Sequence, residues 1–288
     1  MLKKSDKILI IGLGLIGGSY ALALKNKGYF VGGIDLSEKT LNYALKNDII
    51  CDGKNDIDGE FISKFDVLIF ALYPKLIPTY LEKIQKYIKH GAIISDVTGV
   101  KEKLVSSVQK LLRKDLEFIG VHPMAGKESS GIENASAEIF LGANYIITPT
   151  DKNTSKGIEL AKDLAKELGF RKVSLLSPQK HDEMIGFLSQ LTHVLAVSLM
   201  TCNDDENLAL YTGDSFRDLT RIAKINEEMW TELFLENKQE LLSQMQKFLD
   251  KFTQIKTMIE KGDENSLKAV MKLSTERRKA FDKQKGEN

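Results

Sequence analysis

A glycine-rich turn near the start of the chain constrains the fold more than any other feature. The apolar run at residues 8–11 leads directly into GLGLIG at residues 12–17, and a helical pattern follows. A GxGxxG pattern alone is a weak indication, but a strand before it and a helix after it are the required context of a dinucleotide-binding unit. Gly12 would permit the tight turn, Gly14 the approach of a diphosphate, and Gly17 close packing of helix on strand.

Asp35 stands 18 positions after Gly17, at the end of the second predicted strand. A carboxylate there can accept hydrogen bonds from both adenosine ribose hydroxyls and would repel a 2′-phosphate. Lys39 is the only close cation in the sequence, so NAD is favoured over NADP. The alternative is that Asp35 caps the following helix, since Asp35 and Ser37 are both capping residue types. The predicted cofactor-binding residues are Gly12, Gly14, Leu15, Ile16, Gly17 and Asp35.

The first part of the chain alternates strand-like and helix-like patterns. Strands are predicted at residues 7–11, 30–34, 66–72, 92–97, 118–121, 145–148 and 172–176, and helices at 16–26, 38–46, 101–113, 155–168 and within 76–89. Continuous apolar strands that alternate with helices indicate a parallel sheet covered on both faces. We therefore expect an α/β fold with an N-terminal Rossmann-type parallel-sheet domain.

The pattern changes after Pro178, where no convincing strand follows. Residues 184–200 are apolar nearly all round, which predicts a helix buried on several sides. Apolar residues recur at spacings of three and four along a later helical face, namely Leu241, Met245, Phe248, Phe252, Ile255 and Ile259. We place a domain boundary near residue 177, between an NAD-binding domain at 1–177 and an all-helical substrate-binding and dimerisation domain at 178–288.

Composition excludes several classes of protein. The formal net charge of +1 argues against a strongly basic nucleic-acid surface. The two cysteines, Cys51 and Cys202, form neither a CxxC pair nor a disulfide framework, which favours free thiols in the cytoplasm. The basic start and apolar run also match a signal peptide, but the glycines and the shortness of the run favour the phosphate-binding turn. No later stretch is expected to span a membrane.

The segment that begins at His122 gives the first indication of a catalytic residue. His122 follows an apolar strand, and the carboxyl end of such a strand is where ligands bind in open α/β folds. Oxidation of an alcohol by hydride transfer needs a group that takes the hydroxyl proton, and neutral imidazole titrates in the right range. A purely structural histidine at a strand end is the alternative.

Two further histidines lie 12 residues apart in the helical part, His181 and His193. In a continuous helix they would be about 18 Å apart, so both cannot grip one small substrate. Arg217 and Arg221 are spaced i, i+4 and would share a helix face, where a guanidinium can bind a carboxylate in bidentate fashion. For Arg217 a structural salt bridge with Asp214 or Asp218 is an equal alternative.

At these segments the sequence resembles the prephenate and arogenate dehydrogenase family. The matching segments are residues 12–19, 122–126 with Glu128 and Gly131, the pair 181–182, and residues 191–193, 216–223, 229–230 and 234–237. The resemblance implies a Rossmann-type domain followed by a helical domain that forms a homodimer. It also implies a catalytic role for His122 toward the ring hydroxyl, substrate binding by His193, carboxylate binding by Arg221, and a charge-balancing and gating role for Glu128.

Two positions depart from the family pattern. The family often has a serine that orients the catalytic histidine at the position of Gly99, so Thr98 is the candidate for supplying that hydroxyl, with a water molecule as the alternative. The family also often has a proline at the position of Thr192, which bears on local helix geometry.

The resemblance implies oxidation and decarboxylation of prephenate, or of arogenate as the alternative, without a metal, nucleic-acid or membrane partner. A dehydrogenase of the β-hydroxyacid type is less favoured because no lysine in a GxxxK context opens the helical part. A non-catalytic NAD-sensing protein would keep the glycine turn but would not need His122, His193 and Arg221 together.

Overall fold

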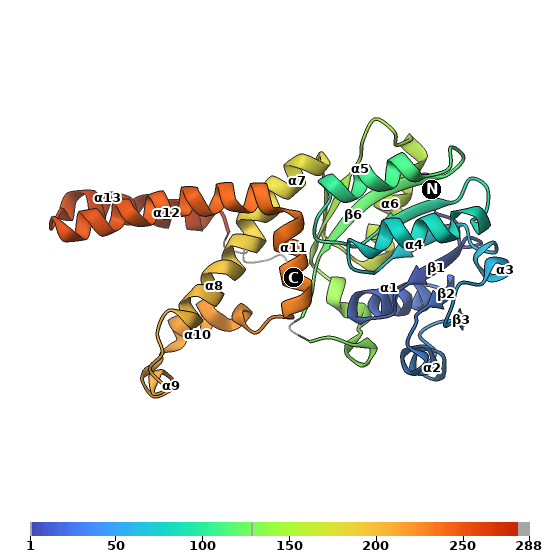
Figure 1. The fold of residues 1–288 in the computed structure, drawn as a ribbon, viewed down its shortest axis with the longest axis horizontal. Coiled ribbons are helices and arrows are strands. Elements are labelled where there is room, and N and C mark those ends of the chain that lie inside the picture. The colour runs from blue at the N-terminus through green and yellow to red at the C-terminus, as the bar shows by residue number, and fades with distance from the viewer. Residues whose placement is uncertain (1, 128, 282–288) are drawn as a thin grey trace. The chain divides into compact units, whose positions relative to one another are not determined.

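The computed structural model describes residues 2–127 and 129–281. Eight strands form one sheet in the order β3-β2-β1-β4-β5-β6-β7-β8 (Figure 1). Their bounds are β1 Lys7–Ile11, β2 Phe30–Ile34, β3 Asp52–Lys54, β4 Val67–Phe70, β5 Ile93–Asp96, β6 Glu117–Met124, β7 Asn144–Thr148 and β8 Lys172–Leu175. The strand order changes direction between β1 and β4, and ligands bind in open α/β sheets at such a switch point.

The predicted parallel sheet is confirmed for β1–β6, whereas β7 runs antiparallel to β6. A parallel neighbour needs a long crossover connection, usually a helix. Among its described residues, the connection from β6 to β7 contains only the short turns Ile132–Asn134 and Ala137–Phe140, and the chain returns alongside β6 in the opposite direction. The sequence patterns also missed β3 and the helix α3 (Gly59–Ile62), which are too short to show a period.

Helices cover both faces of the sheet. On one face α1 (Leu15–Asn26) packs near α6 (Ser155–Leu168), and on the other α4 (Leu76–Ile84) packs near α5 (Glu102–Leu111). Within β1, Ile8 and Ile10 belong to the first core while Leu9 and Ile11 belong to the second. Because successive side chains of a strand point to opposite faces, this double burial explains why the strands are apolar throughout.

The helical part begins with a long, interrupted helix. It comprises α7 (Pro178–Ile185), the π-helical segment Gly186–Leu191 and α8 (Thr192–Thr201). The expected burial on several sides is wrong, because Phe187, Leu188 and Met200 are each at least half exposed. The apolar pattern of this helix therefore includes side chains that the core of the single chain does not cover. The helices α2 (Glu38–Lys46), α9 (Leu208–Tyr211), α10 (Asp214–Thr220) and α11 (Glu227–Glu236) complete the elements up to residue 238, apart from short turns.

The helix Pro178–Thr201 is long enough and apolar enough to cross a membrane. By length and composition, the expectation that no later stretch could do so is therefore wrong. The same test is passed by core helices of proteins that do not span membranes. Here His181 and Asp182 are buried, and Gln190 donates a hydrogen bond to the backbone of Leu233 on α11. These polar contacts are those of a helix packed against protein.

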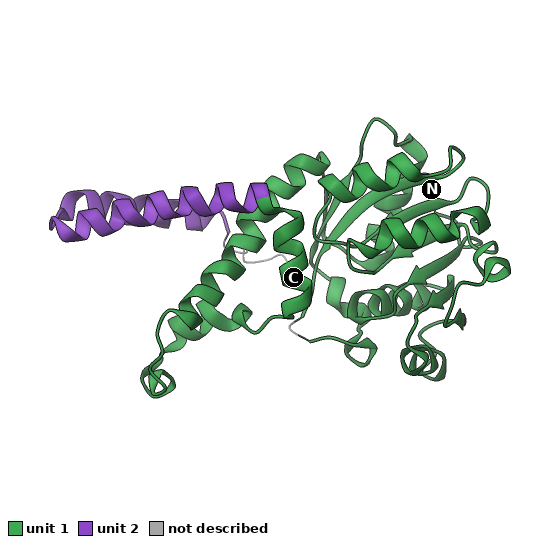
Figure 2. Ribbon diagram, viewed as in Figure 1, with its two compact units in different colours: residues 1–238 green, residues 239–288 purple. Residues whose placement is uncertain are grey.

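By its internal contacts the chain divides into two compact units, residues 1–238 and 239–288 (Figure 2). The second unit consists of α12 (Lys238–Glu260), apart from its first residue, and α13 (Glu264–Lys279). Gly262, with φ +66°, turns the chain between them, and Asp263 caps α13 through the N–H of Ser266. The predicted helix with an apolar stripe is present in α12, where Phe252 and Ile259 are exposed. The predicted boundary near residue 177 stays a prediction.

Candidate active site

The glycine turn has the shape that a diphosphate requires. Gly12 has φ +94°, and a Cβ on it would lie 2.5 Å from the carbonyl oxygen of Ala71. A Cβ on Gly17 would lie 1.9 Å from the carbonyl oxygen of Gly12, so neither position accepts a side chain. A Cβ on Gly14 would meet nothing within 4 Å. Gly14 also precedes α1 without a side-chain cap or an acidic first turn, which leaves this helix N-terminus suited to an anion.

Asp35 is tied to the same turn. Its Oδ2 accepts the N–H of Leu13 at 2.8 Å and its Oδ1 accepts the N–H of Ser37 at 2.9 Å. Ser37, not Asp35, is the N-cap of α2, because its hydroxyl accepts the N–H of Thr40. An ionised carboxylate has about four acceptor sites, so Asp35 keeps capacity for two ribose hydroxyls. The turn and the carboxylate therefore fit a dinucleotide such as NAD.

His122 lies on β6 and is held from one side by a second histidine. Its Nδ1 lies 2.8 Å from Nε2 of His181, and Nδ1 of His181 lies 2.7 Å from Oδ1 of Asp182. Burial lowers the pKa of His122 well below its usual value, and the nearby His181 and Lys101 act in the same direction. Burial also lowers the pKa of His181 to about 3, with Lys101 again contributing. Both imidazoles are therefore neutral at physiological pH, the state in which His122 can accept a proton.

Thr98 is not placed to orient His122. Its hydroxyl oxygen lies 2.6 Å from Oδ2 of Asp96 and 2.9 Å from the backbone oxygen of Val100, either of which can accept its one hydrogen. This places Thr98 beside a buried ion pair. In that pair Nζ of Lys101 lies 2.5 Å from Oδ2 of Asp96, with both side chains fully buried. Burial lowers the pKa of Lys101, and Asp96 opposes that shift. The structure thus corrects the expectation that Thr98 orients the histidine: Thr98 braces the turn after β5.

His193 lies on α8 and faces α11. Its Nδ1 lies 2.8 Å from the backbone oxygen of Ser189, and its ring stacks on the indole of Trp230, with centroids 3.6 Å apart. Leu233, three residues after Trp230 and so on the same face of α11, approaches the other histidine: a Cβ on Gly99 would lie 3.5 Å from Leu233 and 3.8 Å from Nε2 of His122. One face of α11 therefore borders the surroundings of both histidines.

The two predicted arginines differ in their surroundings. Arg217 is exposed on α10, and its guanidinium lies 3.4 Å from Oδ1 of Asp214, which is the salt-bridge alternative weighed above. Arg221 is exposed at the first residue of a 3₁₀ turn, Arg221–Ala223, so the two do not continue one α-helix. This turn packs against α8, the helix that carries His193. Glu128 lies outside the described residues.

Four residues of this region have no role that the sequence alone assigns: His181, Asp96, Lys101 and Trp230. The sequence shows His181 only as a histidine 12 residues before His193. That spacing gives no sign of its contact with His122 on β6. Asp96 and Lys101 form their buried pair only after the turn folds, and Trp230 entered only as part of the family pattern. An isolated Asp-x-x-x-x-Lys spacing carries no signal, whereas the His181-Asp182 pair is among the segments that match the family and could have been given a role on that basis.

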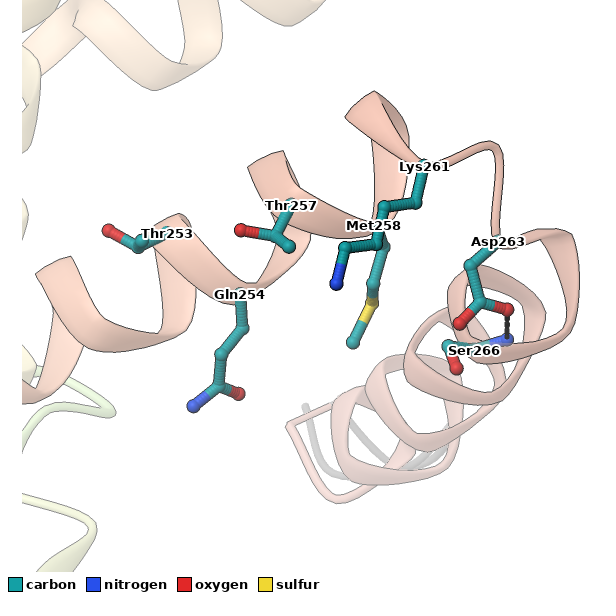
Figure 3. Close-up of a pocket in the computed structure, with 7 residues that line it drawn as sticks. All are labelled: Thr253, Gln254, Thr257, Met258, Lys261, Asp263 and Ser266. Atoms are coloured by element: carbon teal, nitrogen blue, oxygen red, sulfur yellow. Dashed lines mark hydrogen bonds between the residues drawn. The ribbon is translucent and has the colours of Figure 1, made fainter.

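A hollow of about 310 Å³ lies between α12 and α13 (Figure 3). It is lined by Thr253, Gln254, Thr257, Met258, Lys261, Asp263 and Ser266. None of these is a predicted site residue, and the hollow follows from the turn that joins two antiparallel helices. A smaller hollow of about 200 Å³ is lined in part by Asp182, Lys75, Lys103 and Glu236, and so it reaches the far end of the histidine pair.

Comparison with known proteins agrees with this arrangement. The model of the prephenate dehydrogenase nucleotide-binding domain matches residues 20–174, and that of the prephenate dehydrogenase dimerization domain matches residues 177–273. The chain is 32% identical to prephenate dehydrogenase of Bacillus subtilis over 285 residues, which cover 96% of this chain and 76% of that protein. The glycine turn precedes the first matched segment, so its assignment rests on its own geometry.

Solved structures give the same result. Prephenate dehydrogenase of Aquifex aeolicus has a TM-score of 0.90 and 30% identity, with 98% of this chain and 99% of that chain covered. Arogenate dehydrogenase of Synechocystis has a TM-score of 0.83 and 25% identity, with 96% and 100% covered. Family models that match both halves, and relatives matched along nearly the whole length, show that the chain belongs to the prephenate dehydrogenase family.

Proposed function

We propose that the chain oxidises and decarboxylates prephenate with NAD+, giving 4-hydroxyphenylpyruvate, CO2 and NADH in tyrosine biosynthesis. The observation that carries this proposal is the placement of His122 at the end of β6, neutral and held by His181, in a chain of this family. The solved relative from Aquifex aeolicus is in complex with NAD+ and hydroxyphenyl propionate, which supports both the cofactor and a ligand with a hydroxylated ring and a carboxylate.

NAD would be held by Gly12, Gly14, Leu15, Ile16, Gly17 and Asp35, the residues whose turn and carboxylate geometry fit it. When bound, it supplies the acceptor for the hydride that leaves the ring carbon. The chain's own contribution to this step is orientation and exclusion of water. The absence of an arginine near Asp35 in the sequence supports NAD over NADP.

His122 would accept the proton of the ring hydroxyl as oxidation proceeds. Loss of the ring carboxylate as CO2 then restores aromaticity, and that step needs no covalent nucleophile from the protein. His193 and Arg221 are the candidates for binding the substrate, with Arg221 toward a carboxylate. Glu128, which lies outside the described residues, and Arg217, which is paired with Asp214, are the further candidates for substrate binding.

A homodimer and a cytoplasmic location complete the proposal. Apolar side chains are exposed on the part of the chain that matches the dimerization-domain model, among them Phe187, Leu188, Met200, Phe252 and Ile259. Exposed apolar surface of this kind marks protein–protein contacts. The free, exposed thiols of Cys51 and Cys202 suit a reducing compartment.

The test is a spectrophotometric assay of NADH formation with prephenate, arogenate and a 3-hydroxyacid as separate substrates. Turnover of prephenate is the expected result. A strong preference for arogenate would move the assignment to arogenate dehydrogenase, and turnover of the 3-hydroxyacid alone would overturn it. Sedimentation at micromolar concentration tests the dimer, which a purely monomeric protein would contradict.

A further inference from the structure

His181 is a fully buried histidine that the proposed reaction does not use. It lies on α7 with no exposed surface, and its ring is edge-on to that of His122, with centroids 5.0 Å apart. A buried imidazole needs hydrogen-bond partners for both nitrogens. His181 has one partner at each end, Nδ1 of His122 at 2.8 Å and Oδ1 of Asp182 at 2.7 Å.

Asp182 fixes the direction of these hydrogen bonds. Its Oδ1 accepts the N–H of Lys101 at 2.8 Å and its Oδ2 accepts the N–H of Glu102 at 2.9 Å, both at the start of α5. These backbone groups can only donate, and a carboxylate can only accept. The hydrogen between Asp182 and His181 therefore sits on Nδ1 of His181. A neutral imidazole carries one hydrogen, so Nε2 of His181 is an acceptor.

The acceptor state of Nε2 of His181 also fixes where His122 carries its hydrogen. Because Nε2 of His181 accepts, Nδ1 of His122 must carry the hydrogen and donate it. The remaining nitrogen of His122, Nε2, then holds the lone pair. That nitrogen lies 3.8 Å from where a Cβ would stand on Gly99, so residue 99 supplies no side chain to hold it. Thr98 is engaged with Asp96 and Val100, which leaves His181 as the partner that orients the ring.

We propose that His181 and Asp182 are positioning residues that hold His122 in the tautomer whose Nε2 is the base. The proposal rests on the proposed function for its catalytic consequence. As the substrate hydroxyl is oxidised, its proton goes to Nε2 of His122, and the electron pair of the ring C–H bond leaves as hydride to NAD+. His122 keeps its other hydrogen on Nδ1, bonded to His181, so no proton moves to His181 or Asp182.

Charge around the pair is consistent with this role. Lys101, whose charge opposes protonation of both histidines, is itself paired with Asp96 at 2.5 Å, while Lys75, Lys103 and Glu236 line the hollow at Asp182. The carboxylate of Asp182 is therefore the negative charge in line with the His122–His181 bond. When His122 becomes an imidazolium, this charge stabilises it through His181, as the buried aspartate does in a serine-protease triad.

The decisive experiment is NMR of the protein labelled with ¹⁵N in its histidines, of which the chain has only four. Comparison with His122→Asn identifies the His122 signals. In the unmodified protein we expect His122 to be protonated on Nδ1 and bare on Nε2, and His181 to share that pattern. A hydrogen on Nε2 of His122 would overturn the proposal, whatever the enzyme turns over.

Two variants separate positioning from mere packing. His181→Phe fills the space but removes the acceptor, so we expect kcat to fall by roughly 10²–10⁴-fold, as when a base loses its orienting partner, with NAD+ affinity unchanged. His181→Gln can place an amide oxygen near the position of Nε2, so it should recover at least a tenth of the lost rate and keep the Nδ1 hydrogen on His122. Equal losses in the two variants would reject positioning through a hydrogen bond.

The chain offers a matched control in His90, an exposed histidine 3.3 Å from Asp115. His90→Phe removes an exposed histidine–aspartate pair whose Asp115 precedes the start of β6, several residues before His122 along the strand, and should leave kcat unchanged. Should the unmodified protein fail to oxidise prephenate while the NMR pattern is as expected, the proposed function fails and the tautomer assignment stands. If the Phe variant does not fold, the spectrum of the unmodified protein and the Gln variant still decide the question.

Discussion

The imidazole of His193 stacks on the indole of Trp230, with ring centroids 3.6 Å apart and an angle of 28° between the planes. Stacked aromatic pairs contribute about 0.5–1.5 kcal/mol beyond their burial. If His193 binds substrate, Trp230→Leu should raise KM for prephenate about 3–10-fold with little change in kcat, since the stack holds the ring in place. Trp230→Phe keeps an aromatic face and should raise KM less. Steady-state kinetics of the two variants, with Phe234→Leu as a neighbouring control, checks this; equal effects of Phe and Leu would contradict it.

Asp35→Ser should weaken the binding of NAD+ and reduce the preference of the enzyme for NAD+ over NADP+. The carboxylate braces the glycine turn through Leu13 and is proposed to bind the ribose. Hydrogen bonds to charged groups contribute about 1.5–3 kcal/mol, so we expect a loss of roughly 10–100-fold in kcat/KM for NAD+. Activity with NADP+ should rise or stay level, because the repulsion of a 2′-phosphate is removed. A wild-type preference for NADP+ would refute the carboxylate argument.

The pH at which kcat/KM falls on the acid side should be lower than the usual pKa of a histidine. Burial, His181 and Lys101 lower the pKa of His122, so the base stays unprotonated and active as the pH falls through about 6.5. The limb in kcat/KM is expected below that pH rather than at it. His122→Asn cannot take a proton at neutral pH, so kcat should fall roughly 10²–10⁴-fold and the limb should flatten. A limb that persisted unchanged in the variant would belong to another group, with His193 the first to test.

The same shifts make stability fall in acid. His122 and His181 are neutral in the folded chain, and both have a lowered pKa, whereas the unfolded chain takes up protons below about pH 6.5. The free energy of unfolding should therefore be highest above that pH and decline as the pH drops from 7 to 5, by at most about 1.4 kcal/mol per pH unit and group. Burial raises the pKa of Asp182, which acts in the opposite direction. Urea denaturation of His181→Gln should show a shallower decline, and an unchanged slope would show that His181 does not contribute.

Arg221 and Arg217 form a matched pair of variants. Arg221→Ala should raise KM for substrate by roughly 10–100-fold while NAD+ binding is retained, since a hydrogen bond to a charged group contributes about 1.5–3 kcal/mol. Arg217→Ala removes an exposed ion pair with Asp214, which contributes at most about 1 kcal/mol, and KM should hardly change. If both variants left KM unchanged, Arg221 would be structural.

Local sequence was enough to predict the nucleotide-binding part of the fold. The glycine turn, Asp35 and the fully apolar strands each follow from short-range requirements of backbone geometry and double burial, so their positions could be read directly. The direction of β7 could not, because it depends on how residues 125–143 return to the sheet. Exposure of Phe187 and Leu188 could not either, since an apolar helix pattern does not say whether the covering surface belongs to the same chain.

The site was predictable only in part for a similar reason. His122 follows a strand and is recognisable from its position alone. Its partner His181 is 59 residues away, and their contact depends on the packing of α7 against α5 and β7. Thr98 neighbours the position of the family's serine, but its hydroxyl lies 2.6 Å from the charged carboxylate of Asp96, a partner that local sequence does not reveal.

The π-helical segment Gly186–Leu191 has an angular consequence for the two histidines of the long helix. An α-helix advances about 100° per residue, so residues 12 apart would differ by about 120° in direction. A π-bulge accommodates one extra residue in a turn, which reduces the difference to about 20°. On this geometry His181 and His193 point to nearly the same side of the helix. Asn237 donates to the backbone oxygen of Asp182, before the π-helical segment, and to Oε1 of Gln190, within it. If the same residues formed an ordinary α-helix throughout, with none deleted, His193 would be turned by about 100° away from Trp230, with every side chain of the site still present.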